Sequence, residues 1–163
     1  MNQAVAAFSS EQPRALRAIL PAGLTCGALD ITAALLVYGS FGLGPLRLLQ
    51  GIASGLLGPV AYEGGMATAL LGLLCHFFIA LSAAAIFFAT SRRFSFLVEH
   101  AIFSGALYGV AVYFVMARIV VPLSAARRGP FSFKFMFIGI VIHIFCVGLP
   151  IATLVRKYSY NRD

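Results

Sequence analysis

Two histidines lie in the middle of otherwise apolar stretches of this chain. His76 belongs to LLGLLCHFFIAL (70–81), and His143 belongs to GIVIHIFCVGLP (139–150). A neutral imidazole is a common metal ligand, and its charge changes readily near neutral pH. A third ionisable group, Asp30, lies in another apolar stretch. Ionisable side chains in such surroundings are candidates for ligand binding, cofactor ligation or proton transfer.

Small residues at helical spacing indicate which way these groups point. Cys26, Asp30 and Ala34 share one helix face, and Gly72, His76 and Ala80 share another. Stripes of small side chains mark surfaces where membrane helices pack closely. We therefore expect Asp30, His76 and His143 to face the inside of a bundle at a similar depth. The glycines predicted to pack helices are Gly23, Gly27, Gly72, Gly105, Gly109 and Gly139.

An aspartate in the centre of a bilayer costs about 2.5–3.5 kcal/mol on insertion scales. Packing alone is one explanation, because interhelical hydrogen bonds contribute about 0.6 kcal/mol each. We expect the cluster of Asp30, His76 and His143 to pack helices and to bind a ligand or relay protons. Tyr108 and Arg118 are further candidates for ligand binding or proton relay.

A cofactor is the alternative use of the two histidines. Imidazoles from separate helices can hold the iron of haem b, with Gly72 and Gly139 leaving space one turn away for a flat macrocycle. A transition metal would use His76 and His143 with Cys146 or Cys26, which lie three or four residues from His143 and Asp30. Either centre would make this an electron-transfer or cofactor-handling protein. A further alternative is an accessory subunit of a larger membrane complex.

The composition places the chain in a membrane. Of its 163 residues, 61% are hydrophobic and 10% are charged, and the mean hydropathy is +0.95. Soluble domains have about a quarter of their residues charged. The net charge of +7 comes from basic residues that flank apolar runs rather than form one face, which argues against nucleic acid as a partner. No nucleophile–base pattern occurs, so the sequence leans against an enzyme.

Four runs have the length of about 20 residues that a spanning helix needs. They cover 18–38, 66–90, 101–123 and 135–155, between a polar leader (1–17) and a basic tail (156–163). A short amphipathic helix over 45–57 carries Arg47, Gln50 and Ser54 on one side and leucines on the other, so we expect it to lie along the interface. A re-entrant loop is the alternative there. The predicted fold is an all-α, four-transmembrane-helix bundle.

Flanking charges predict the orientation. Seven basic residues fall on the side of the termini, against four or five on the other, so both termini are expected in the cytoplasm. GALDITAALLVYG in the first span resembles GALYGVAVYFVMA in the third, which suggests tandem helix pairs and aligns Tyr108 with Asp30. The expected partners are the lipid bilayer and either further copies of the chain or a larger membrane complex.

The stretches ASGLLG (53–58), LGLLCHFFIA (71–80) and HIFCVGLPIA (143–152) resemble small uncharacterised bacterial four-helix membrane proteins. The layout is similar to the YagU-like group, in which histidines also occur in the second and fourth spans. The resemblance implies a multi-pass protein of the bacterial inner membrane. It implies no established activity and no catalytic residue.

Overall fold

The computed structural model describes residues 3–127, 129 and 131–160, with side-chain surroundings given for 15–127, 129 and 131–158. All regular elements in these ranges are helical. Four helices are long and apolar enough to cross a membrane, over Ala15–Ser40, Gly65–Arg93, Ala101–Leu123 and Phe133–Tyr158. Each includes the range predicted for it, so the expectation of four apolar helices is confirmed.

The first two long helices are continuous, and the last two are composite. α1 covers Gln3–Ser40, which includes most of the expected leader, and α3 covers Gly65–Arg93. The third consists of α5 (Ala101–Val115), a π-helical segment η2 (Met116–Val120) and α6 (Val121–Leu123). The fourth consists of α7 (Phe133–Ile142), a π-helical segment η3 (His143–Gly148) and α8 (Leu149–Tyr160). Residues 161–163 of the expected tail lie outside the described residues.

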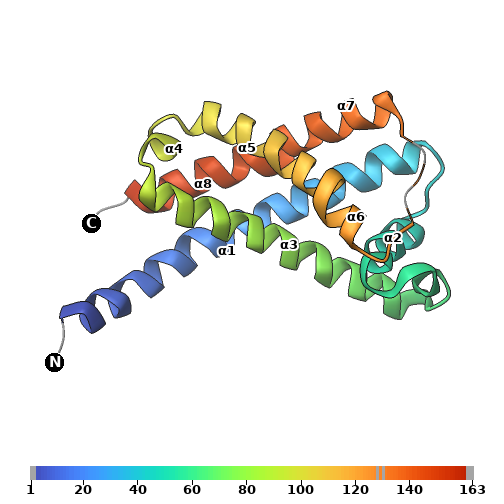
Figure 1. Cartoon of the computed structure of the whole chain (residues 1–163), viewed down its shortest axis with the longest axis horizontal. Coiled ribbons are helices and arrows are strands. Elements are labelled where there is room, and N and C mark those ends of the chain that lie inside the picture. The colour runs from blue at the N-terminus through green and yellow to red at the C-terminus, as the bar shows by residue number, and fades with distance from the viewer. Residues whose placement is uncertain (1–2, 128, 130, 161–163) are drawn as a thin grey trace.

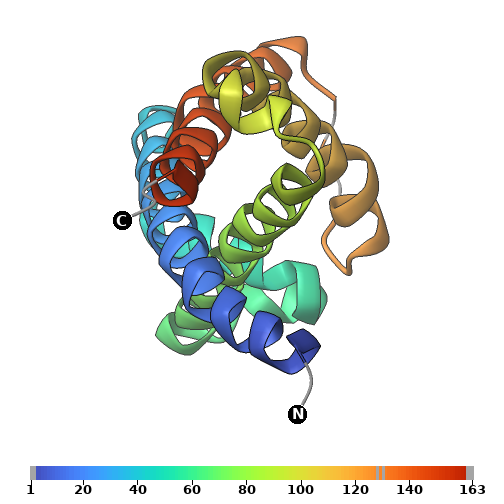
Figure 2. The same ribbon diagram turned by 90° about the vertical axis from the view of Figure 1, so that its left-hand side faces the viewer.

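The four helices form a bundle whose two ends differ (Figure 1). The start of α1, the end of α8 and the short helix α4 (Phe96–Glu99) lie at one end, which we call the terminal end. The helix α2 (Pro45–Leu57) and the 3-10 helix η1 (Gly58–Tyr62) lie at the other, the α2 end. Seen along its length, the bundle is a ring in which α1 lies between α3 and α8, and α8 packs on α5 (Figure 2).

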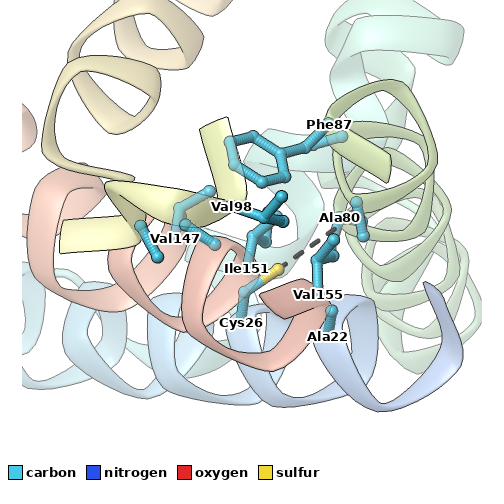
Figure 3. Packing of buried hydrophobic residues seen from close by; sticks show 12 residues of the cluster. Ala22, Cys26, Ala80, Phe87, Val98, Val147, Ile151 and Val155 are labelled. Carbon is cyan, nitrogen blue, oxygen red and sulfur yellow. Dashed lines mark hydrogen bonds between the residues drawn. The ribbon is translucent and has the colours of Figure 1, made fainter. Parts of the chain in front are cut away.

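A cluster of buried apolar side chains, which we call the dry core, fills the terminal end of the bundle (Figure 3). It is built largely from small and β-branched side chains, such as Ala22 of α1, Ala84 of α3 and Ile151 of α8. The aromatic ring of Phe87 joins α3 to α5, because it packs edge-on against Tyr108 with ring centroids 5.0 Å apart. The Tyr108 hydroxyl also donates a hydrogen bond to the carbonyl of Ala83 at 2.7 Å. These contacts close the ring between α3 and α5 at this end.

Glycines allow the third and fourth helices to meet backbone against backbone. A Cβ added at Gly109 would collide with the carbonyl of His143, and one at Gly148 would collide with the carbonyl of Gly105. In the other half of the bundle, Gly23 lies against Leu81 and Gly27 lies against the ring of Phe77. Each helix pair therefore packs at a distance that larger side chains would prevent.

Each π-helical segment ends two residues before a proline. Pro122 follows η2, and Pro150 follows η3. A proline lacks the N–H group for the usual bond to the carbonyl four residues earlier, and its ring collides with that carbonyl. A local π adjustment is one of the ways in which a membrane helix accommodates a proline. His143 is the first residue of η3, so the fourth predicted span over 135–155 contains a π-helical segment between two α-helices.

The helix expected at 45–57 is present as α2, but Gln50 and Ser54 of its polar side face the protein, whereas Arg47 is exposed. Gln50 is 2% exposed and Ser54 is 3% exposed, whereas Leu56 is 66% exposed. The Gln50 side-chain amide donates to the carbonyl of Gly65 at 3.0 Å. A helix that lies on a membrane surface keeps the side chains of its polar side in water, which Gln50 and Ser54 do not reach. The predicted interfacial orientation is therefore not supported by the burial of Gln50 and Ser54.

Candidate functional site

Asp30, His76 and His143 line a single cavity of about 450 Å³ inside the bundle. Asp30 comes from α1, His76 from α3 and His143 from the start of η3. Most of the remaining lining is apolar, from residues such as Ile79, Val112 and Met116. Small-molecule sites have volumes of about 300–1,000 Å³ and apolar walls with a few polar groups.

The dry core closes this cavity toward the terminal end. Four residues belong both to the core and to the cavity wall: Cys26, Ala80, Ala83 and Val147. In the opposite direction, the wall continues to Gly51 and Gly55 of α2 and to Ser124 in the segment that follows α6. The cavity therefore lies between the dry core and the α2 end.

A second hollow of about 460 Å³ adjoins the cavity at the α2 end. The two share Tyr38, Leu48 and Gly51 in their walls. The Arg47 side chain also lines the second hollow, where its guanidinium carbon lies 5.2 Å from the centre of the Tyr62 ring. A basic group and an aromatic hydroxyl thus stand beside the cavity rather than within it.

The ring of His76 joins α3 to α1. Its Nε2 atom lies 2.8 Å from the carbonyl oxygen of Gly27. A carbonyl oxygen only accepts hydrogen bonds, so Nε2 is the nitrogen that carries the proton and donates. In the neutral ring the lone pair is then on Nδ1, which remains an acceptor.

The ring of His143 is held by its own helix. Its Nδ1 atom lies 2.9 Å from the carbonyl oxygen of Gly139, so Nδ1 donates and Nε2 keeps the lone pair. The ring of Tyr113 lies edge-on to it, with centroids 5.5 Å apart. The two histidines of the cavity therefore have opposite tautomers when neutral.

Asp30 is half-buried, and among the described residues it is the only one that brings a carboxylate to the cavity wall. Within the described part of the chain, its side chain has neither a hydrogen bond nor an ion pair. A carboxylate accepts several hydrogen bonds when ionised. The Asp30 side chain therefore has more unused hydrogen-bond acceptor positions for a ligand than any other side chain described in the cavity wall.

Two predicted members of the cluster lie elsewhere. Tyr108 donates to Ala83 within the dry core and does not line the cavity. Arg118 is exposed, and its guanidinium carbon lies 5.8 Å from the centre of the Phe131 ring. The structure thus keeps Asp30, His76 and His143 together and separates Tyr108 and Arg118 from them.

The predicted metal ligands do not form a metal-binding group. Among the described residues, no three His, Cys, Asp or Glu side chains lie close enough together to hold an ion. Cys26 lines the cavity, with its thiol 3.9 Å from the carbonyl oxygen of Ala80 and 3.4 Å from that of Gly23. Cys146 does not line it. The four predicted ligands, His76, His143, Cys146 and Cys26, are therefore not gathered at one point.

The space expected for a haem macrocycle beside Gly72 and Gly139 is filled. A Cβ at Gly72 would collide with the carbonyl of Leu49 in α2, and one at Gly139 would collide with the ring of Tyr113. The prediction of space was wrong because neighbouring groups occupy it. These two glycines instead allow a helix backbone and an aromatic ring to approach closely.

Sequence reasoning did not place α2 or Tyr38 at this site. Gly51 and Gly55 of α2 lie in the cavity wall, and Tyr38 stands between the two hollows. The four-residue spacing of these glycines was the available signal, because the same spacing marks close contact in the long helices.

No protein-family model, no curated protein and no solved structure matches this chain. The fold and the site define only a general class. In its described residues it is a helical protein with four helices apolar enough to cross a membrane and with a cavity between them whose wall carries ionisable groups. The resemblance to the YagU-like group stays a prediction.

Proposed function

We propose that this chain is an integral membrane protein whose central cavity binds a small, largely apolar organic solute. The observation that carries the proposal is the meeting of Asp30, His76 and His143 in the wall of one cavity of about 450 Å³. Apolar walls would hold the body of the solute, and the three polar side chains would fix its orientation. His76 would also stabilise the bundle through its bond to Gly27.

We further propose that the protein lies in a bacterial inner membrane with both termini in the cytoplasm. The excess of basic residues on the terminal side supports this orientation. The start of α1 and the end of α8 at one end of the bundle are consistent with it (Figure 1). The α2 end would then face the outer side, with the exposed Arg47 near the lipid headgroups.

The test fills the cavity and measures binding. Ala34 of α1 lines the cavity, whereas Ala28 of the same helix is exposed and does not. Ala34→Leu therefore removes cavity volume, and Ala28→Leu adds the same atoms to the outer surface. Purified protein in lipid nanodiscs would be titrated with benzylammonium, benzyl alcohol and benzoate, and binding would be followed by saturation-transfer NMR.

We expect at least one of these probes to bind the native protein and Ala28→Leu, and to lose its binding in Ala34→Leu. A leucine side chain occupies space that the aromatic ring of the probe needs. Absence of binding by every probe would contradict the proposal, and so would binding that Ala34→Leu leaves unchanged.

A further inference from the structure

We propose that the solute is a protonated organic amine, with Asp30 as its counterion and the two imidazole rings as hydrogen-bond acceptors. This inference rests on the proposed function and specifies the chemical class of the ligand. It follows from which hydrogen-bonding groups of the cavity wall are already bonded within the protein and which are still available to a ligand.

Nearly all donors in the cavity wall are engaged with backbone carbonyls. The N–H groups of His76 and His143 donate to Gly27 and Gly139. The Ser124 hydroxyl donates to the carbonyl of Val121 at 2.8 Å. The Cys26 thiol points at backbone carbonyls as well. A solute that needs donors, such as a carboxylate, would find few here.

The groups that remain are acceptors. They are the carboxylate of Asp30, the Nδ1 atom of His76 and the Nε2 atom of His143, since each ring donates through its other nitrogen. The hydroxyl of Tyr38 both donates and accepts, so it does not alter this balance. A ligand with N–H donors complements this set of groups.

The charges around the cavity also favour a protonated amine as the ligand. Among the residues that the structure describes, no lysine or arginine lines the cavity. Two basic side chains at the α2 end lie over aromatic rings: Arg47 lies over Tyr62, and the ammonium nitrogen of Lys134 lies 4.6 Å from the centre of the Phe41 ring. Asp30 therefore has no internal counterion among the described residues. An ionised carboxylate in a low-dielectric site is stabilised by an opposite charge, which a bound ammonium group would supply.

The apolar wall excludes a bare inorganic cation as the preferred ligand. Metal ions need several oxygen, nitrogen or sulfur ligands, and the described residues do not gather three such side chains. An organic amine needs only one or two polar contacts, and its hydrocarbon part gains by leaving water. A quaternary ammonium ion supplies the charge but has no N–H group for the imidazole nitrogens.

The test compares four probes with the same aromatic ring in native protein: benzylammonium, benzyltrimethylammonium, benzyl alcohol and benzoate. Dissociation constants would be measured in nanodiscs at neutral pH. We expect benzylammonium to bind most tightly and benzoate most weakly. In Asp30→Asn, the affinity for benzylammonium should fall at least about 30-fold, because a buried charge pair loses one partner. Benzyl alcohol should bind as before.

Glu99→Gln is the matched control. It removes one negative charge, as Asp30→Asn does, but Glu99 is exposed at the terminal end. The control should leave all four affinities unchanged. If benzyl alcohol or benzoate binds as tightly as benzylammonium, the proposal of an amine ligand is contradicted, while the proposal that the cavity binds a solute stands. If no probe binds, both proposals are contradicted. Equal affinity for benzylammonium and benzyltrimethylammonium overturns the role of the imidazole acceptors. Should Asp30→Asn fail to fold, the ranking in native protein decides the question alone.

Discussion

At the scale of single residues, the two histidines have different attachments although each lies in an apolar helix. His76 bonds to a neighbouring helix, and His143 bonds within its own helix. The sequence predicted both as inward-facing groups, because a small residue lies one turn before each. It did not indicate which nitrogen each ring would use, since that depends on which carbonyl lies within reach.

The opposite tautomers are a testable consequence. We expect neutral His76 to carry its proton on Nε2 and neutral His143 to carry its proton on Nδ1. The ¹⁵N chemical shifts of the ring nitrogens distinguish the two forms, and His76→Gln would assign the signals. Identical tautomers in both rings would contradict the hydrogen bonds described above.

Gly148 should be among the least replaceable of the glycines at helix contacts. In Gly148→Ala, the new methyl group would press on the backbone of Gly105 and Gly109 and force α5 away from η3. We expect a loss of about 1–3 kcal/mol of stability, as for other overpacked sites. The measurement is thermal unfolding in detergent. Gly39→Ala is the control, because a Cβ there would meet no atom within 4 Å, and it should not lower the unfolding temperature.

Residue patterns had a clear limit at Tyr108 and Gly139. Alignment of two similar helix sequences placed Tyr108 beside Asp30, whereas the packing of α5 on α3 places it in the dry core. A glycine next to a histidine suggested room for a cofactor, whereas Tyr113 fills that room. Both errors arise because a helix pattern identifies a contact face without identifying what occupies it.

At the scale of elements, α2 shows why amphipathic patterns need a partner before they can be interpreted. Its sequence separates polar and apolar sides. In lipid, polar side chains need hydrogen-bonding partners from the protein, so Gln50 and Ser54 of the polar side pack inward. Gln50 accordingly faces α3, where its amide reaches Gly65 and, at 3.5 Å, the hydroxyl of Thr68. The bounds of this helix were predictable from its prolines and glycines, and its rotation was not.

Gln50→Leu should loosen α2. The substitution removes the hydrogen bond from the Gln50 amide to the carbonyl of Gly65, and a typical intramolecular hydrogen bond contributes about 0.5–1.5 kcal/mol. We expect faster hydrogen exchange of the α2 amides, measured by mass spectrometry in nanodiscs. Arg47→Leu alters the exposed side of the same helix and should leave that exchange unchanged. Equal exchange in the two variants would show that Gln50 does not anchor α2.

One aspect of the π-helical segments could be predicted from the sequence. Pro122 and Pro150 signal a disturbance of the preceding turn. What could not be predicted is the form of the disturbance, since a kink, a 3-10 turn or a π turn all relieve the same missing bond. At η3, the backbone of His143 also lies against Gly109 of α5, a contact between separate helices that the proline alone does not reveal.

At the scale of the whole molecule, hydropathy and length determined the number and positions of the apolar helices. Every predicted span lies within one of the four helices observed. The cavity was not predictable in the same way. Its wall combines residues of α1, α2, α3, α5 and η3, whereas α3 and α5 meet through Phe87 and Tyr108 beside it, and this arrangement depends on the tilt of each helix.

The orientation can be tested on the full chain. We expect a fluorescent protein fused after Asp163 to be fluorescent in bacteria and an alkaline phosphatase at the same place to be inactive, because the C-terminus is predicted in the cytoplasm. Reporters inserted in the loop near Gly129 should give the opposite pair of results. Activity of the phosphatase at the C-terminus would reverse the proposed orientation.

The dry core at the terminal end has an electrical consequence. A cation that reaches Asp30 from the α2 end would travel part of the way through the membrane field and stop there. If Asp30 lies halfway, the field contributes about 1.2 kcal/mol per 100 mV, or about sevenfold in affinity. Benzylammonium should therefore bind more tightly in vesicles held negative on the terminal side, and benzyl alcohol should not respond to the voltage.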